Sequence, residues 1–279
     1  MTSLIAKAPN DTDPLNSPNH NTQHGYIADA INLGWVTINT TMVYSSADDP
    51  TYVMKTDDDV NLTGEIGVGM KIKITQSTGG IKFFIITKIN YNSDVANRTA
   101  ITMYGGTDFD LVNEAISSPC YSTAKAPLGF PLSQDKWSIE TTDTTRRDQA
   151  SATAGTWYNL GSLNISVPIG VWDTWYSCSL GGSRATPGSG FGELYSTLST
   201  ANNSESDADF TSGGGFYLVP SDTGWGGNIN NCQRKFLAVT TKTTYYWNHR
   251  QITATAAFDT LSMRNDLAKA KLRITCAYL

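Results

Sequence analysis

The feature that most constrains this chain is the alternation of apolar and polar residues in short segments. Met70, Ile72 and Ile74 fall on one face of such a segment, and the residues between them are polar. A two-residue period is that of a β-strand, whose side chains point alternately to opposite faces. Glycine and asparagine separate the segments, as they do in the turns of antiparallel sheets. Because the same alternation returns over residues 270–278, the whole chain is predicted to be all-β.

The composition supports this fold class and narrows the function classes. Charged residues make up only 16% of the 279 residues, below the roughly 25% of typical globular proteins. The net charge of −5 provides no basic surface for nucleic acid. No apolar run is long enough to span a bilayer, and the first residues lack the pattern of a secretory signal. We therefore expect synthesis in the cytoplasm, with no nucleic-acid partner and no membrane insertion.

Residues 1–25 are predicted to form an extended N-terminal arm. They are rich in Asn, Asp, Thr and Pro, and three prolines oppose regular structure. Two interpretations remain open. The segment is either an unstructured terminus or an arm that becomes ordered against a partner.

Residues 26–137 are predicted to form a small β-barrel of the OB or SH3 type with one short helix. The first strand is expected over residues 36–44, and about four more follow before Gly105. Asp108 is a candidate N-cap for the helix. A proline-bearing connector, residues 117–137, ends this domain. The apolar face of the expected helix consists of Leu111, Val112, Ala115 and Ile116.

The second half is predicted to be a β-sandwich or jelly roll over residues 157–279, joined to the first domain by a polar linker, residues 138–156. Seven or eight strands are expected, with a loop-rich region over residues 181–231. The most regular strand ends the chain, where Leu272 and Ile274 alternate with polar residues.

The four cysteines do not form a metal-binding pattern. They lie 44 to 58 residues apart, whereas zinc ligands come in closely spaced pairs. Cytoplasmic synthesis favours free thiols that are buried as small apolar side chains, although a disulfide stays open. We expect no cofactor and no metal. The cysteines are Cys120, Cys178, Cys232 and Cys276.

The acidic run Asp57–Asp59 fails the test for a calcium loop. In the EF-hand pattern that starts at Asp57, position six requires glycine and position twelve requires glutamate. The chain has Leu62 and Val68 there. A solvated turn is therefore expected.

No catalytic motif is recognisable. A glycosidase needs two carboxylates across a cleft, and four acidic residues lie in loop-like sequence that cannot pair them. The chain has no G-x-S-x-G elbow, and His249 is the single histidine in sequence that is expected to fold. We therefore expect a protein without enzymatic activity. The four acidic residues are Glu193, Glu205, Asp207 and Asp209.

Aromatic residues are the candidate contact sites. Trp225 lies in the glycine-rich stretch 224–227, which is predicted to be a loop, as is 213–215. An indole exposed on a loop can stack on a sugar or fill an oligomer interface. Tyr246 and Trp247 lie on a predicted strand, where a core position is favoured for at least one of them and a glycan or interface contact remains open.

Two segments carry a resemblance to a known group of proteins. Tyr104–Asp108 reads YGGTD and Lys125–Pro131 reads KAPLGFP. Over residues 35–137 the chain resembles uncharacterised structural proteins encoded by tailed bacteriophages and prophages, in which a small β domain precedes such a connector. The resemblance carries over no functional residues.

The resemblance implies a virion structural protein, made in the bacterial host, that docks on capsid, portal or tail proteins through its N-terminal part. Its β-sandwich would project outward as a head fibre, decoration or baseplate adhesin, in contact with solvent or a host glycan. A homo-oligomer is expected, with a trimer favoured. The alternatives are a carbohydrate-binding module and a cell-wall polysaccharide hydrolase.

Overall fold

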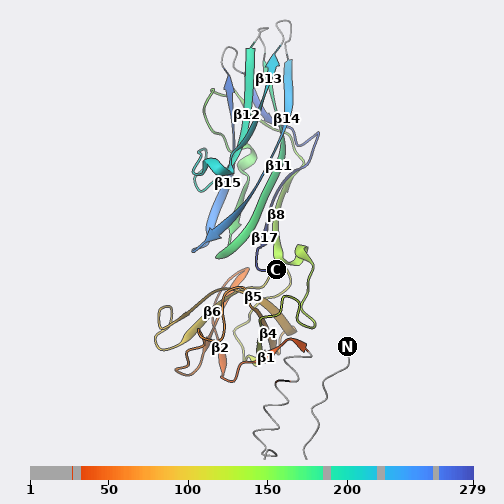
Figure 1. Ribbon diagram of the computed structural model, residues 1–279. Coiled ribbons are helices and arrows are strands. Elements are labelled where there is room, and N and C mark those ends of the chain that lie inside the picture. The colour runs from red at the N-terminus through yellow and green to blue at the C-terminus, as the bar shows by residue number, and fades with distance from the viewer. Residues whose placement is uncertain (1–26, 28–32, 185–189, 219–223, 254–257) are drawn as a thin grey trace, which may run out of the picture. The chain divides into compact units, whose positions relative to one another are not determined.

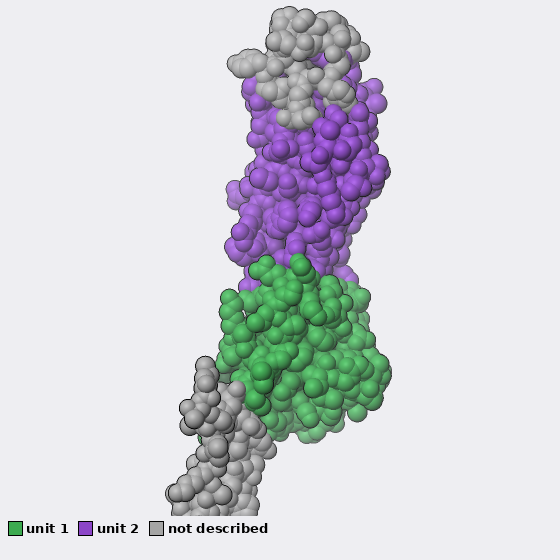
Figure 2. Space-filling model, turned by 90° about the vertical axis from the view of Figure 1, so that its right-hand side faces the viewer, with its two compact units in different colours: residues 1–137, 278–279 green, residues 138–277 purple. Residues whose placement is uncertain are grey.

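The computed structural model describes residue 27 and residues 33–184, 190–218, 224–253 and 258–279, with the backbone alone for 190, 216–218, 224–228 and 253. These residues form seventeen strands and three short 3-10 turns, which confirms the all-β class. The chain divides into two compact units (Figure 2). Unit 1 ends at Trp137 and also contains Tyr278 and Leu279, and unit 2 spans Ser138–Ala277.

Unit 1 is built on one antiparallel sheet in the order β1-β7-β4-β5-β6-β3-β2 (Figure 1). The two end positions of this order, β1 and β2, are successive parts of one segment of the chain, which pairs with β7 through its first part and with β3 through its second, so the sheet curls round on itself as in a small β-barrel. Its inner face buries an apolar cluster that includes Met54, Ile72 and Phe84. The strands are β1 (Val36–Thr37), β2 (Met42–Asp48), β3 (Thr51–Thr56), β4 (Lys71–Gln76), β5 (Gly80–Tyr91), β6 (Thr99–Tyr104) and β7 (Ser117–Ser122).

The expected first strand, residues 36–44, is divided into β1 and β2. The backbone N–H of Ile38 donates to the carbonyl of Pro119, which extends the pairing of β1 with β7. The carbonyl of Thr41 instead accepts a hydrogen bond from the backbone N–H of Asp57. The alternation continues through the break, so the pattern alone could not locate it.

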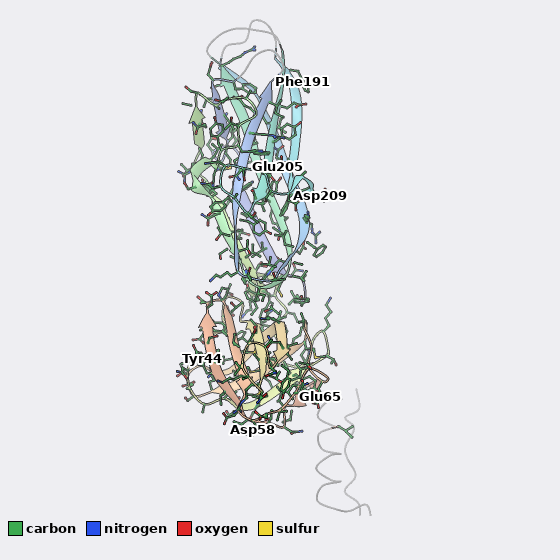
Figure 3. The ribbon with its side chains drawn as sticks, turned by 90° about the vertical axis from the view of Figure 1, so that its left-hand side faces the viewer. Tyr44, Asp58, Glu65, Phe191, Glu205 and Asp209 are labelled. Atoms are coloured by element: carbon green, nitrogen blue, oxygen red, sulfur yellow. The ribbon has the colours of Figure 1, made fainter. Side chains whose placement is uncertain are left out.

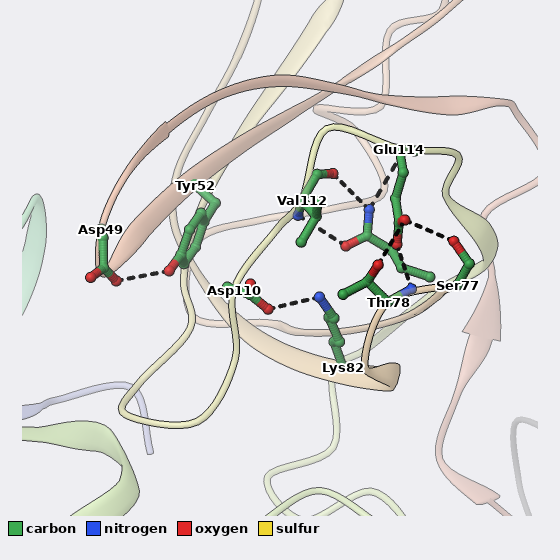
Figure 4. A network of polar contacts seen from close by, with 9 residues as sticks. Asp49, Tyr52, Ser77, Thr78, Lys82, Asp110, Val112 and Glu114 are labelled. Atoms are coloured by element: carbon green, nitrogen blue, oxygen red, sulfur yellow. Dashed lines mark hydrogen bonds and ion pairs between the residues drawn. The ribbon is translucent and has the colours of Figure 1, made fainter.

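The short helix expected after Asp108 does not form, because side chains of the β4–β5 hairpin hold this segment in an irregular conformation (Figure 4). The Gln76 amide donates to the carbonyl of Val112 at 2.8 Å and accepts from its N–H at 3.1 Å. The nearly buried Lys82 ammonium lies 2.7 Å from the Asp110 carboxylate. These bonds replace the intrahelical ones, so tertiary contacts override the helical pattern.

The predicted connector, residues 117–137, is only partly a connector, because its first residues form β7 between β1 and β4. The rest of it packs onto unit 1 through aromatic rings. Phe130 and Trp137 stack with centroids 4.9 Å apart and an interplanar angle of 4°. The Trp137 indole donates to the carbonyl of Pro131 at 2.6 Å, and the Trp35 indole donates to that of Leu128 at 2.8 Å. The 3-10 turn η1 (Gln134–Trp137) ends the unit.

Unit 2 is a sandwich of two antiparallel sheets. One has the order β10-β15-β12-β13, and the other has the order β8-β17-β11-β16-β9 with β14 paired to β11. The strands are β8 (Ser138–Asp143), β9 (Arg147–Ala150), β10 (Asn164–Val167), β11 (Gly170–Arg184), β12 (Gly190–Ser199), β13 (Ser212–Leu218), β14 (Gly224–Val239), β15 (Thr243–Thr253), β16 (Thr260–Met263) and β17 (Ala270–Cys276), with 3-10 turns η2 (Leu160–Ser162) and η3 (Ala208–Phe210).

Two of the strands in the larger sheet are interrupted at the same level. Asp143, the last residue of β8, is opposite Ala270, and Arg147, the first of β9, is opposite Met263. The gaps after Asp143 and after Met263 therefore lie side by side, while β11 continues past both. An ion pair between Arg147 Nε and Asp143 Oδ2, 2.8 Å apart, crosses the first gap. The pairs β8/β9 and β16/β17 thus act as one strand each.

Counted in this way, unit 2 is an eight-stranded jelly roll. The first strand pairs with the last, the second with the seventh, the third with the sixth and the fourth with the fifth. Such nested pairing is a long hairpin rolled into two sheets. The space between the sheets is filled by fully buried side chains, among them Trp172, Tyr176, Leu194, Leu198, Trp247 and Ile274.

Two predictions about unit 2 are wrong. Residues 138–156 are not merely a linker, because they form two strands of the larger sheet. In this segment, β8 pairs with β17 and β9 pairs with β16. Residues 181–231 are not mainly loops, because β12, β13 and much of β14 lie there. The misleading signal was glycine, which here marks places where rings cover the backbone. A Cβ at Gly213 would lie 2.1 Å from the Tyr195 ring, and one at Gly215 would lie 2.2 Å from the Phe191 ring.

Replacing Gly105 with alanine tests the packing of unit 1. The new Cβ would lie 2.0 Å from the carbonyl oxygen of Phe109, a backbone atom that cannot move without displacing the segment seen in Figure 4. We expect Gly105→Ala to lower the free energy of unfolding by about 2–3 kcal/mol. Gly64→Ala is the control, since nothing lies within 4 Å of its Cβ. Equal thermal stabilities of the two variants would contradict this packing.

Candidate functional site

The aromatic residues singled out in the sequence do not form a common site. Trp225 belongs to β14 and lies opposite Ser183, so it is not on a loop. Its side chain is outside the described residues. Trp247 is completely buried between the sheets, which excludes it as a surface contact. Tyr246, half-buried on β15, is the one residue of the three whose described side chain reaches the surface.

The four candidate catalytic carboxylates are occupied by local structure. Glu193 accepts a hydrogen bond from the Tyr195 hydroxyl at 3.0 Å. Glu205 accepts from the Thr211 hydroxyl and lies 3.8 Å from Arg250 Nη1. Figure 3 shows Glu205 separated from Asp209 on the surface of unit 2.

The other two carboxylates both face Lys235. Asp207 forms an ion pair with the Lys235 ammonium and caps η3 through the N–H of Asp209. The Asp209 carboxylate is largely exposed, with its Oδ2 3.7 Å from the same ammonium. Asp207 and Asp209 thus share one ammonium, whereas Glu193 and Glu205 are engaged in separate contacts.

The rings that cover the glycines of β13 are engaged in packing. The Arg250 guanidinium lies 4.4 Å from the Trp157 ring centroid and 5.2 Å from that of Tyr195. Since β12 residue Tyr195 is also opposite Gly213, its ring lies between Arg250 and the β13 backbone. The contacts of Arg250 with Trp157 and Tyr195 therefore stabilise the outer face of the smaller sheet, and they leave little ring surface for a ligand.

A buried polar cluster lies inside unit 2. His249 Nδ1 is 2.9 Å from Ser196 Oγ, and Cys178 Sγ is 3.3 Å from the same hydroxyl. Asn231 donates to that hydroxyl at 3.4 Å. Burial lowers the pKa of His249 to about 3 and raises the pKa of the Cys178 thiol to about 12. The residues are 3% exposed or less, so this serine–histidine pair is a structural element of the core and cannot be reached by a substrate.

The cysteines are free thiols, and their positions differ from the expectation. Cys178 and Cys276 are buried as predicted, but Cys120 is half-buried and Cys232 is exposed on β14. Among the residues that the structure describes, no three His, Cys, Asp or Glu side chains converge in a way that suits a metal ion. The described part of the chain also contains no helix long and apolar enough to cross a membrane.

The outer face of the larger sheet presents an aromatic site that the sequence analysis did not identify. Trp175 lies in the middle of β11, opposite Arg234 on β14 and Arg273 on β17. Phe236 follows on the same face of β14 and is 62% exposed. Arg234 Nε donates to Asp173 Oδ1 at 2.7 Å, which fixes the guanidinium beside the indole. The strand alternation of β11 could have placed Trp175 on this face.

Unit 1 contains a separate pocket of about 730 Å3. It lies at the break between β1 and β2, between the residues that join these two strands and the loop that follows β3. Its lining is apolar at the bottom, with Ile38, Met42 and Leu62 buried, and acidic at the rim, with Asp58 and Glu65 exposed. Both carboxylates are labelled in Figure 3 at the surface of unit 1.

The sequence matches no protein-family model and no curated protein. Among solved structures, the chain is similar to a chain of infectious bursal disease virus, Gx strain, with 11% identity, a TM-score of 0.26, and 88% of this chain and 62% of that chain covered. A second is from T=1 particles derived from the infectious bursal virus, with 11% identity, a TM-score of 0.27, and 85% and 55% covered.

A third is the tandem domain CBM22-1-CBM22-2 of Paenibacillus barcinonensis Xyn10C, with 9% identity, a TM-score of 0.17, and 88% of this chain and 94% of that one covered. This chain thus spans less than two thirds of each virus chain. Scores at this level carry no argument about function.

The buried histidine predicts a pH dependence of stability. The pKa of His249 is about 3 in the folded protein and about 6.5 in an unfolded chain. As the pH falls, the unfolded state therefore binds a proton before the folded state does. The stability that the neutral imidazole provides is fully present above pH 6.5 and is lost as the pH falls toward 3. Urea unfolding measures the free energy of unfolding at each pH. Between pH 6 and pH 4, we expect this free energy to fall less steeply in His249→Asn than in the native chain, by up to about 1.4 kcal/mol per pH unit. Identical slopes for both proteins would contradict the burial of a neutral imidazole.

Proposed function

We propose that this chain is a non-enzymatic structural component of a bacteriophage particle, in which unit 1 docks on other virion proteins and unit 2 is displayed. The observation that carries the proposal is that the first and last strands of the jelly roll are paired. Its first and last strands lie side by side, with Ser138 Oγ 2.8 Å from Thr275 Oγ1. Both connections of unit 2 to the rest of the chain therefore leave from one end of the sandwich.

The opposite end of the sandwich is suited to display. Strands of both sheets end there. Arg184 at the end of β11 pairs with Gly224 at the start of β14, and Gly190 at the start of β12 pairs with Leu218 at the end of β13. Jelly rolls serve in viral capsids and in lectins, although a fold alone does not determine a function. The polar residues described inside unit 2 are used for packing, which agrees with a role that depends on shape.

The proposal predicts that the chain travels with assembled particles. In a density gradient of a lysate from the natural host, the chain should peak in the virion fraction, with several copies per particle by quantitative mass spectrometry. A host cytoplasmic protein followed in the same fractions is the control. Recovery of the chain with that control protein, and its absence from the particles, would contradict the proposal.

Carbohydrate binding is the second candidate, and the outer face around Trp175 favours it. An indole with exposed aromatic and charged neighbours can stack on a sugar ring while the charged groups bind hydroxyls. Because the rings of the smaller sheet are packed against Arg250 and glycine backbone, the larger sheet is the better face for such a contact.

This candidate predicts that affinity electrophoresis in a host cell-wall polysaccharide slows the native chain. Trp175→Ala should weaken binding about fivefold and reduce the shift accordingly, because a stacking contact is worth about 1 kcal/mol. Tyr246→Ala changes the other sheet and should leave the shift intact. If the native chain is not slowed, or if Tyr246→Ala alone removes the effect, Trp175 is not a sugar platform.

A further inference from the structure

The pocket of unit 1 is a feature that the docking role does not by itself explain. It encloses about 730 Å3, a volume in the range of sites that hold small molecules or a few side chains. Its wall begins at Thr37, the last residue of β1, and continues to Met42, the first residue of β2. The first strand of the unit therefore borders the pocket.

The lining defines the chemistry of the occupant. Ile38, Met42 and Leu62 are at most 6% exposed, and Val60 and Ile116 add further apolar surface. Aliphatic side chains buried against this surface would stabilise a complex by roughly 25 cal/mol per Å2 of apolar area removed from water.

The rim adds a charge preference. No lysine or arginine is among the lining residues, and neither Asp58 nor Glu65 has an ion-pair partner among the residues described. By contrast, the nearby Asp59 lies 3.8 Å from Arg98. An occupant that carries a cation beside aliphatic groups would satisfy both parts of the lining.

The chain contains one such segment close to the pocket in sequence. Residues 4–7 read Leu-Ile-Ala-Lys, and Lys7 is the only lysine or arginine before Lys55. About 29 residues separate Lys7 from Thr37, which allow a reach of up to roughly 95 Å at about 3.3 Å per residue. The tether is therefore long enough to return to the pocket, and it keeps the segment at a high effective concentration.

We propose that this pocket binds the N-terminal segment Leu4–Lys7 of the same chain. Leu4 and Ile5 occupy the apolar bottom, and the Lys7 ammonium lies at the rim between Asp58 and Glu65. The proposal is independent of the particle role. It assigns to the N-terminal arm a docking site on unit 1, which a neighbouring copy could also use by exchange.

A competition experiment on the full chain tests this site. In the triple variant Leu4→Ser, Ile5→Ser, Lys7→Gln, the segment no longer fits, so the pocket is open to a peptide added in solution. We expect a fluorescent peptide of residues 1–12 to bind this variant at least tenfold more tightly than it binds the native chain, whose own segment competes. Fluorescence anisotropy at low salt measures both affinities.

Charge variants then locate the bound peptide. Added to the triple variant, Asp58→Asn with Glu65→Gln should weaken peptide binding about three- to tenfold, and a peptide with Gln in place of Lys7 should bind as weakly. Asp57→Asn is the matched control, because this exposed carboxylate precedes Asp58 but does not line the pocket. No binding to the triple variant, equal binding to the native chain, or an equal loss with Asp57→Asn would each overturn the proposal.

Discussion

The antiparallel ladder between β11 and β14 is the constraint on which unit 2 depends. The two strands pair from Gly170 with Val239 to Arg184 with Gly224, interrupted by a single register shift after Gly182. The other edge of β11 carries β17 and β16 in succession. Because β11 is continuous, the interrupted first and last strands can be aligned along it, and the nested pairing of the jelly roll follows.

The interior of unit 2 combines large apolar side chains with polar side chains, two of which form hydrogen bonds to nearby carbonyl groups. The Tyr176 hydroxyl donates to the carbonyls of Ser196 and Phe210, at 2.7 and 3.0 Å. The Gln251 amide donates to the carbonyls of Ala152 and Phe258. A buried polar group without such a partner costs a few kcal/mol. These residues therefore fix the arrangement of strands and loops around the core, and they offer no open site for chemistry.

Much of this architecture could be predicted from the sequence, because strand alternation depends on burial alone. The segments around Ile72, Ile165 and Ile274 were all identified as strands, and each is one. Residues 105–116 could not be predicted, since the bonds from Gln76 and Lys82 that hold them come from distant sequence. The glycines of β13 suggested a loop, because the rings that cover them belong to β12.

The candidate site illustrates the same limit. Trp175 alternates with buried neighbours and was identifiable as an outward residue, but its arginine neighbours depend on the pairing of three strands. The pocket of unit 1 depends on the break between β1 and β2, which the uninterrupted alternation conceals. Sequence pattern thus predicted the strands, and tertiary contacts determined where the surface could bind something.

A cryo-electron microscopy reconstruction of the particle tests the account most directly. The account predicts several copies of an eight-stranded jelly roll, each attached through the end where Ser138 and Thr275 lie side by side, with the end at Arg184 and Gly224 directed outward. Particles without density for this chain, or with the jelly roll attached through its Arg184 end, would contradict it.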